Sequence, residues 1–204
     1  FKTEVSDEIQ NFLKEPKREL SFSTGVCIAH YKEPLSLVLG KAHQMQDAAK
    51  EYDENKDCFA IHVIKGSGEA HTTIWKNFAS ESNSNACNLE TVTQNLKSKT
   101  DNHNADFSDT FIKNLQRELS ILLDKDKELS KPDNFKTEMK RLVIRSCQLK
   151  GDEKKQKKQN FTDLLVKMFE QNPSIKNFFS MLDICNFIQR SINPKTEELC
   201  QSSK

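Results

Sequence analysis

The stretch Ser21–Lys50, SFSTGVCIAHYKEPLSLVLGKAHQMQDAAK, joins a short alternating segment to a long amphipathic one through a polar turn. In the alternating part, every second residue belongs to a bulkier set that comprises Leu20, Phe22, Thr24, Val26 and Ile28. The remaining residues are small throughout and comprise Ser21, Ser23, Gly25, Cys27 and Ala29. A period of two residues predicts a β-strand whose side chains point alternately to the two faces of a sheet.

The two faces of this strand have different interpretations. The bulkier face is expected to be ordinary core. The small face lets either another backbone or a flat ligand approach closely, because it carries no large side chain. A tightly packed helix and a nucleotide both fit that pattern, and the alternation alone leaves both open.

The segment after the turn predicts a helix over residues 34–52. Pro34 suits the first turn of a helix. One apolar stripe follows at helical spacing and comprises Leu35, Val38, Leu39, Ala42, Met45, Ala49 and Tyr52. A polar turn then leads into residues 58–64, CFAIHVI, a continuous apolar run typical of a buried central strand, and residues 66–68 are expected to end it. Strand, helix and strand in this order predict a right-handed βαβ unit or its ferredoxin-like relative.

The segments on both sides of this unit are predicted to be helical. Before it, Val5, Ile9, Phe12 and Leu13 fall at helical spacing, and Pro16 ends the pattern. After it, a Ser/Asn-rich joint at residues 80–88 precedes apolar periodicities that predict helices over 89–96, 107–123, 135–149, 161–169 and 175–192. Helices with mostly short connections predict a bundle. The fold class is therefore α/β plus α, with a partial α/β domain over residues 1–80 and a helical bundle over residues 81–204.

Composition excludes several classes of protein. The chain of 204 residues is 35% hydrophobic and 30% charged, which is typical of a folded domain with a polar surface. The net charge of +1 means that nucleic-acid binding needs a local basic patch. No apolar run approaches the roughly 18 residues of a membrane span, so a cytoplasmic protein without membrane contact is expected. The start at Phe1 suggests a portion of a longer protein.

The six cysteines include no Cys-x-x-Cys pair, which argues against a zinc ribbon or a thioredoxin-like site. We expect reduced core thiols. The histidines have no metal-ligand spacing, and His62, inside an apolar run, is expected to be a hydrogen-bonded core residue. The sequence contains no Ser-His-Asp order, phosphate-binding Gly-rich loop or paired buried carboxylates.

Three groups of basic residues are candidate binding sites. His30 and Lys32 follow a predicted strand, where α/β sheets place ligand-binding groups, although a solvated turn explains them too. Lys50 ends the predicted helix, where an ammonium suits either a phosphate or the helix dipole. A predicted loop between two helices carries Lys154, Lys155, Lys157 and Lys158. That loop is either solvated or in contact with a nucleic-acid backbone, in a way that is independent of base sequence and sensitive to salt.

Several short motifs in this region resemble one family. They are Gly25-Val26, Ile28-Ala29-His30-Tyr31-Lys32, Pro34-Leu35 and Ile64-Lys65-x-Ser67-Gly68-Glu69. In outline the region is similar to the second half of a nucleotide-cyclase-type palm, as in diguanylate cyclases, and in detail to the large polymerase-like subunit of type III CRISPR effector complexes, particularly the III-B form. Residues 107–119 and 177–192 resemble the first long and the last helix of that subunit's C-terminal helical domain. The resemblance is closest over residues 20–70.

The resemblance implies a palm that converts ATP into an oligonucleotide messenger when target RNA is bound, with two divalent ions, magnesium or manganese, held by carboxylates. The family's acids lie in a Gly-Gly-Asp-Asp hairpin before the matched segment, and this chain contains no such sequence. The chain by itself is therefore expected to supply no catalytic residue and to bind no metal or ATP alone. The acids are expected in the part of the protein before Phe1.

The resemblance also implies roles for individual residues. Ser23 and Gly25 match the Ser-x-Gly strand beside the nucleotide site, Lys50 the helix lysine that reaches the triphosphate, and Lys32 a Lys-x-Pro turn with a phosphate or RNA role. The implied partners are the remainder of the large subunit, the small helical subunit, other effector subunits, guide RNA and target RNA. Two alternatives remain. A stand-alone diguanylate-type cyclase leaves the later helices unexplained, and a helical protein-interaction module would be indifferent to ATP.

Overall fold

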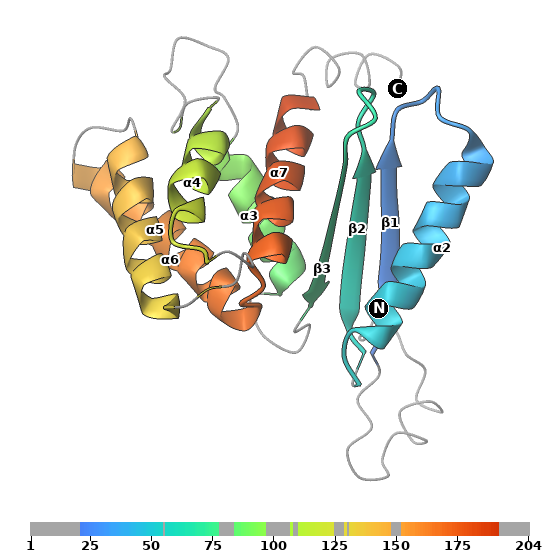
Figure 1. Ribbon diagram of the computed structural model, residues 1–204, viewed down its shortest axis with the longest axis horizontal. Coiled ribbons are helices and arrows are strands. Elements are labelled where there is room, and N and C mark those ends of the chain that lie inside the picture. Colours follow the sequence, from blue (N-terminus) through green and yellow to red (C-terminus); the bar gives the residue numbers. More distant parts are fainter. Residues whose placement is uncertain are drawn as a thin grey trace.

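A computed structural model describes the chain over residues 21–54, 56–77, 84–96, 107, 110–124, 129, 131–147 and 152–191, without the side chains of 152–154. Within this part, a three-stranded sheet is followed by helices (Figure 1). The strands are β1 (Thr24–Ala29), β2 (Cys58–Ile64) and β3 (Ala70–Lys76). The helices are α2 (Leu35–Glu51), α3 (Asn85–Leu96), α4 (Phe111–Ser120), α5 (Pro132–Ser146), α6 (Asp152–Gln171) and α7 (Ile175–Ser191).

The sheet is mixed, with β2 in the middle. β1 pairs with β2 in parallel, and the register sets Cys27 beside His62. Helix α2 makes the crossover between these strands, as the alternating strand, the amphipathic helix and the apolar run predict. The βαβ unit and the α-helical character of the later segments are therefore confirmed. The predicted amphipathic segment over residues 5–13 lies outside the described residues.

One strand was not predicted. Residues 66–68 follow the end of β2, as expected, and lie in a tight turn, in which Gly68 adopts φ of +82° and donates its N–H to the carbonyl of Lys65 at 2.9 Å. The chain reverses there, and β3 pairs antiparallel with β2 along its full length. The sequence of β3, AHTTIWK, has only two large apolar residues, which is why its pattern alone did not mark a strand.

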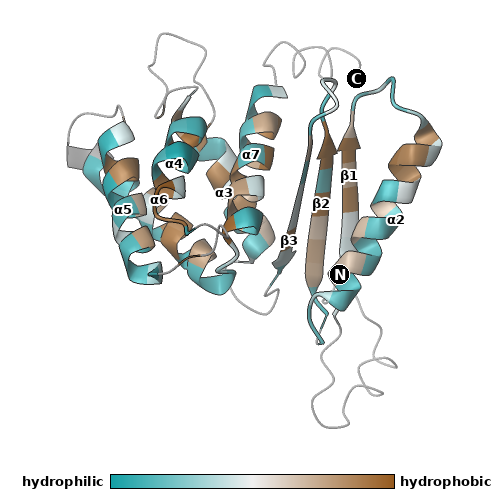
Figure 2. Cartoon of the chain, in the orientation of Figure 1, coloured by the Kyte–Doolittle hydropathy of each residue, from teal (hydrophilic) through white to brown (hydrophobic). Residues whose placement is uncertain are grey.

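Two layers of helix cover the sheet. Helix α2 packs on one face against β1 and β2, and the helical part packs on the other face, with α7 against β3 (Figure 1). The hydropathy colouring places apolar residues along the middle of the sheet and on the inner sides of the helices (Figure 2). The larger hydrophobic core joins Trp75 of β3 to the phenylalanines of the helices, among them Phe111, Phe135 and Phe178. A smaller core lies under α2.

The proposed division at residues 80 and 81 stays a prediction, since the residues around it lie outside the described part. What the structure adds is that Trp75 of the sheet is fully buried in the same core as the helices. Apolar burial is the main favourable term in folding. The α/β part and the helices are therefore expected to stabilise one another.

Candidate functional site

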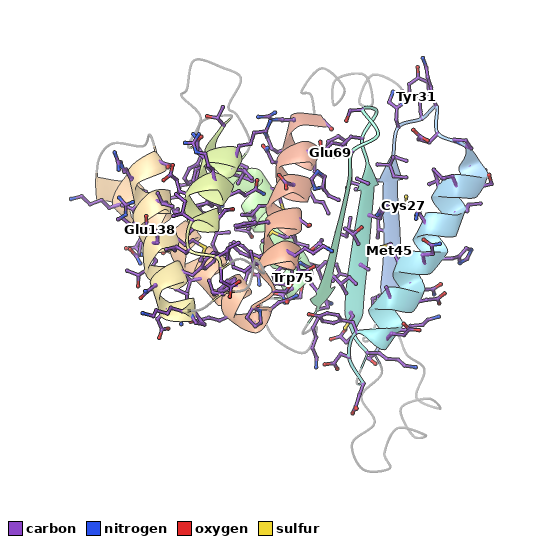
Figure 3. The ribbon with its side chains drawn as sticks, in the orientation of Figure 1. Cys27, Tyr31, Met45, Glu69, Trp75 and Glu138 are labelled. Carbon is purple, nitrogen blue, oxygen red and sulfur yellow. The ribbon has the colours of Figure 1, made fainter. Side chains whose placement is uncertain are left out.

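The small face of β1 lies directly beneath helix α2. A Cβ atom added at Gly25 would be 2.2 Å from the backbone N of Gln46 and 2.5 Å from the carbonyl O of Ala42. Cys27 and Met45 lie at the same interface, on β1 and α2 respectively (Figure 3). Of the two occupants that the sequence leaves open for this strip, the helix is the one that contacts Gly25. The absent side chain is what lets the helix backbone approach so closely.

Ser23 lies at the start of the same strip, and its Oγ atom is covered. Within the described part of the chain this hydroxyl has no hydrogen-bond partner. A buried hydroxyl without a partner costs free energy, so such a group is either a strained feature or one that awaits a partner. The nucleotide-binding roles of Ser23 and Gly25 stay predictions.

The two lysines predicted for the nucleotide site lie at opposite ends of α2. Lys50 is in its last turn, with its side chain 46% exposed and its Nζ 3.8 Å from Oδ1 of Asp47. Lys32 precedes the helix, and its Nζ lies 5.6 Å from the centre of the Tyr31 ring. A helix of 17 residues is about 25 Å long. The structure therefore brings Gly25 toward the Lys50 half of α2 and keeps Lys32 at the far end, so the two lysines do not share one phosphate group.

The bulkier face of β1 was predicted to be core, and this prediction is wrong for two of its residues. Phe22 is 55% exposed and Val26 is 38% exposed. The reason is tertiary, because the helices that cover this face of the sheet pack mainly against β3. An open apolar surface on a sheet face indicates a place where further protein packs.

His62 and Cys27 lie side by side under α2 on neighbouring strands. The Nδ1 atom of His62 lies 2.7 Å from Oγ1 of Thr72, as expected for a hydrogen-bonded core histidine. Burial lowers the pKa of His62, and the nearby Lys41 ammonium lowers it further. Burial also raises the pKa of the Cys27 thiol. Both shifts favour the neutral form, so this pair is suited to packing.

The four lysines of the predicted basic loop lie instead in α6, which begins at Asp152. The prediction of a loop there is wrong, because nine polar residues in succession, from Asp152 to Asn160, continue into the apolar helix without a breaker. Lys155 and Lys157 are exposed and Lys158 is half-buried. The side chain of Lys154 lies outside the described part. The nucleic-acid role of all four stays a prediction.

The lysine segment is far from the sheet along the axis of α6. Asn172, just after the end of α6, donates its side-chain amide to the carbonyl of Ile74 in β3 at 3.1 Å. From residue 155 to residue 172 the helix rise amounts to about 25 Å. The basic segment and the residues predicted for the nucleotide site therefore form separate surfaces.

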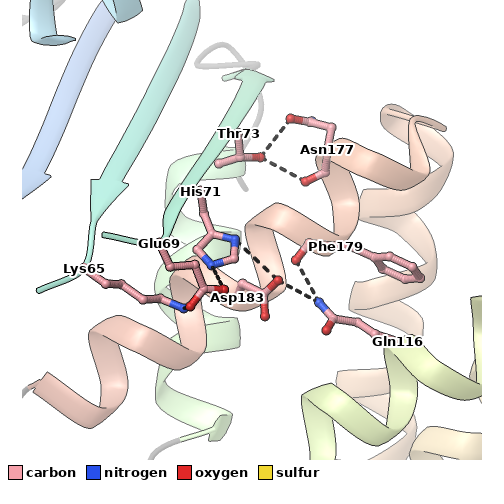
Figure 4. A network of polar contacts seen from close by, with 8 residues as sticks. All are labelled: Lys65, Glu69, His71, Thr73, Gln116, Asn177, Phe179 and Asp183. Atoms are coloured by element: carbon pink, nitrogen blue, oxygen red, sulfur yellow. Dashed lines mark hydrogen bonds and ion pairs between the residues drawn. The ribbon is translucent and has the colours of Figure 1, made fainter. Parts of the chain in front are cut away.

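A polar network at the β2–β3 turn was not predicted (Figure 4). His71 places its Nε2 atom 3.0 Å from Oε1 of Glu69 and its Nδ1 atom 3.6 Å from Oδ2 of Asp183 in α7. Gln116 of α4 donates to the same Asp183 oxygen at 2.9 Å. A hydrogen bond and ion pair with Lys65, at 3.0 Å, hold the pKa of Glu69 below its ordinary value.

This network connects the turn to two helices that are distant in the sequence. The bond between Gln116 and Asp183 spans 67 residues. Side chains that meet across such a separation leave no periodic signal, and only the pair Glu69-x-His71 is visible locally. The arrangement fixes the position of the turn relative to α7.

The described residues contain no group of three or more His, Cys, Asp or Glu side chains placed to hold a metal ion. In the same part of the chain, no helix combines the length and the apolar character that crossing a membrane requires. The five described cysteines, Cys27, Cys58, Cys87, Cys147 and Cys185, are all free thiols.

Comparison with known proteins identifies the first part of the chain. Residues 1–60 match the family described as Cas10/Cmr2, second palm domain. A search of curated proteins found no match. The matched residues include β1, α2 and the start of β2, which is the segment in which the motifs resemble the large subunit of type III CRISPR effector complexes. Residues 1–60 are therefore similar to the second palm domain of the Cas10/Cmr2 family.

Proposed function

We propose that the chain is the C-terminal part of the large subunit of a type III CRISPR effector complex, of the III-B form. In this proposal the palm makes oligonucleotide messengers from ATP when target RNA binds, and the complex acts in RNA-guided antiviral defence in the cytoplasm. The observation that carries the proposal is the family match over residues 1–60, which coincides with the β1–α2 segment and the start of β2.

Two features support the idea that this α/β part is completed by the remainder of the subunit. Among the described residues, β1 pairs with β2 alone, so its other edge is available to a further strand. On the apolar stripe of α2, Leu35 is 70% exposed and Leu39 is 50% exposed. A strand beside β1 would extend the sheet beneath this part of α2 and cover both side chains.

The chemistry of such a palm would be divided between two parts of the subunit. Divalent magnesium or manganese would activate a ribose hydroxyl and stabilise the leaving phosphates, on carboxylates that the remainder of the subunit supplies. From this chain, Lys50 would bind a phosphate of ATP through its exposed ammonium, and Ser23 and Gly25 would form the wall behind it. Lys32, at the far end of α2, would bind a different phosphate or the RNA.

The helical part would bind other components of the complex. Ile121 and Ile144 are 74% and 45% exposed, and exposed apolar side chains of this kind suit an interface with the small helical subunit. The basic start of α6 would contact the backbone of guide or target RNA. This contact would weaken as the salt concentration rises.

The test uses the whole effector complex with target RNA. Lys50→Ala is expected to weaken ATP binding about tenfold, since it removes one charge-assisted contact, and to leave the melting temperature unchanged. Lys140→Ala, at an exposed position of α5, is the matched control and is expected to leave ATP binding unchanged. Isothermal titration calorimetry with ATP measures both.

The outcomes separate the proposal from its alternatives. Equal ATP affinity for the Lys50→Ala and Lys140→Ala complexes would remove Lys50 from the site. If a Ser23→Ala complex also binds ATP normally, the alternative of a helical interaction module without a nucleotide role is favoured. Conversion of ATP, or of GTP to a cyclic dinucleotide, by the chain alone would favour a stand-alone cyclase.

A further inference from the structure

The turn between β1 and α2 carries an aromatic side chain that is almost entirely exposed. Tyr31 is 84% exposed, and Figure 3 shows it at the upper edge of the sheet, beyond the end of β1. A single exposed tyrosine is common on protein surfaces. What distinguishes Tyr31 is the set of residues around its ring.

The Tyr31 ring is held in position by the residue before it. The ring centres of His30 and Tyr31 are 4.5 Å apart, and the two planes are inclined at 42°. His30 is fixed in turn, because its Nδ1 atom accepts the backbone N–H of Lys32 at 3.3 Å and its carbonyl accepts the N–H of Glu33 at 2.9 Å. A ring that is already ordered loses little conformational entropy when a ligand stacks on it.

A lysine ammonium lies beside the same ring. Lys32 is exposed, and its Nζ atom is 5.6 Å from the centre of the Tyr31 ring, which is within the range of a cation–π interaction. Proteins bind single-stranded nucleic acid through such pairs, because the ring stacks on a base and the cation binds the backbone phosphate. Stacking of this kind tolerates any sequence, since every base has a flat face.

The neighbouring turn leaves space on this side of the sheet. The parallel strands β1 and β2 end together, since Ala29 is paired with Ile64. Residues 66–68, which follow β2, are small and exposed, and a Cβ atom added at Gly66 would lie 3.9 Å from Cδ2 of His30. The tip of this turn therefore lies beside His30 without a bulky side chain. The carboxyl ends of parallel strands are also where α/β sheets place their ligands.

The Tyr31 turn is separate from the phosphate site proposed for Lys50. The two residues lie at opposite ends of α2, whose 17 residues measure about 25 Å. One nucleotide is too short to reach from one end to the other. A base on Tyr31 therefore does not belong to the nucleotide whose phosphate Lys50 would bind. A strand of RNA, in contrast, offers bases and phosphates in succession.

We propose that Tyr31 stacks on an unpaired nucleobase and that Lys32 binds the phosphate next to it, with single-stranded RNA as the source of that base. The inference rests on the proposed function in one respect, namely that this end of α2 meets RNA. It does not require that Lys50 binds ATP.

RNA binding by the full chain tests the stacking. Fluorescence anisotropy of a labelled single-stranded RNA is expected to show about tenfold weaker binding for Tyr31→Ala, because the stack on one base is lost. Tyr31→Phe keeps the ring and is expected to bind as the unsubstituted chain does. Tyr52→Ala is the matched control and is expected to leave the affinity unchanged, since Tyr52 is 45% exposed at the other end of α2.

Two further measurements identify the ligand. The same RNA annealed to its complement presents no free base face, so Tyr31→Ala is expected to leave binding of the duplex unchanged. Lys32→Ala is expected to reduce the slope of log affinity against log salt concentration by about 0.7, the contribution of one phosphate in a single strand.

ATP titrated against the full chain distinguishes the two sources of a base. Normal RNA affinity with weaker ATP affinity in Tyr31→Ala would assign the base to a free nucleotide and overturn the choice of RNA. Equal RNA affinities for Tyr31→Ala and Tyr52→Ala, both folded by circular dichroism, would overturn the stacking itself, and so would the absence of RNA binding by the full chain.

Failure of this inference can be told apart from failure of the proposed function. If ATP binding by the effector complex depends on Lys50 while RNA binding is indifferent to Tyr31, the proposed function stands and the stacking site is wrong. If RNA binding depends on Tyr31 while ATP binding is indifferent to Lys50, the stacking site is supported and the ATP role of Lys50 is contradicted.

Discussion

Asn177 of α7 pairs with Ile74 of β3 as a neighbouring strand would. Its Oδ1 atom accepts the backbone N–H of Ile74 at 2.8 Å, and its Nδ2 atom donates to the carbonyl of the same residue at 2.7 Å. The hydroxyl of Thr73 donates to Asn177 Oδ1 at 2.9 Å. One side chain thus satisfies backbone groups on the outer edge of β3 and anchors the sheet to the helices.

Replacement of this amide tests the anchor. Asn177→Ala is expected to lower the free energy of unfolding by about 2 kcal/mol, since the backbone N–H of Ile74 loses its partner in a partly buried site. Asn114→Ala in α4, at an exposed position, is the control and is expected to change it by less than about 0.5 kcal/mol. Urea denaturation measures both. If the two variants lose similar amounts of unfolding free energy, the contact between Asn177 and the edge of β3 contributes little to stability.

Two glycines give a matched test of the contact between β1 and α2. Gly25→Ala is expected to destabilise the protein by about 2 kcal/mol or more, because the new Cβ meets backbone atoms of α2 that are not able to rotate away. Gly40→Ala lies within α2 with no atom within 4 Å of the new Cβ. It is expected to stabilise the protein by about 0.5–1 kcal/mol, because alanine loses less backbone entropy in a helix. Thermal melts that rank the two variants in the opposite order would contradict this packing.

The buried His62 is expected to make stability sensitive to mild acid. Burial and Lys41 lower its pKa from an ordinary value of 6.5, so the unfolded chain takes up the proton first. The contribution of the neutral His62 ring to the free energy of unfolding is therefore complete above about pH 6.5. It is lost as the pH falls through the lower pKa that His62 has in the folded protein. In His62→Gln, urea midpoints are expected to vary less with pH between about 7 and 5.

The exposed His43 on α2 provides the control for this pH dependence. His43→Gln is expected to retain the pH dependence of the unsubstituted chain. If the curves of the His62→Gln and unsubstituted chains run parallel between these pH values, the acid sensitivity has another origin.

The described cysteines are expected to react with a thiol reagent in an order set by burial. Cys87 is exposed, whereas Cys58 and Cys185 are each 1% exposed. Burial raises the pKa of Cys58 to about 11 and that of Cys185 to about 12, which leaves little thiolate to react. At about pH 8, labelling of Cys87 is expected to be at least about 100-fold faster than that of either buried thiol. Mass spectrometry of timed samples measures the rates, and denaturant should abolish the difference.

The βαβ unit could be predicted because its signals are local. The alternation before Ala29, the helical stripe after Pro34 and the apolar run of β2 each specify their own backbone hydrogen bonding. The later helices could be predicted for the same reason, because the spacing of their apolar residues indicates that one side of each helix is buried. The strand β3 escaped prediction because its buried residues, Thr73 and Trp75, depend on partners from α7 and not on an apolar pattern.

The candidate site was predictable only as a set of residues and not as an arrangement. The spacing of Ser23, Gly25, Lys32 and Lys50 is the same whichever occupant lies on the small face of β1. Their arrangement follows from the fold, which places the two lysines at opposite ends of α2. The network of His71 and Asp183 and the pairing of Asn177 with Ile74 also required the tertiary structure.

The sequence by itself determined the order and type of most elements and their relation to a palm, since periodicity and short motifs are properties of neighbouring residues. Only the tertiary structure decided which face of β1 the helix covers, that its bulkier face borders an open groove, and that the basic segment extends a helix. The physical reason is that a side chain becomes buried only where two surfaces pack against each other. A strand specifies its two faces, but the elements that pack against them come from elsewhere in the chain.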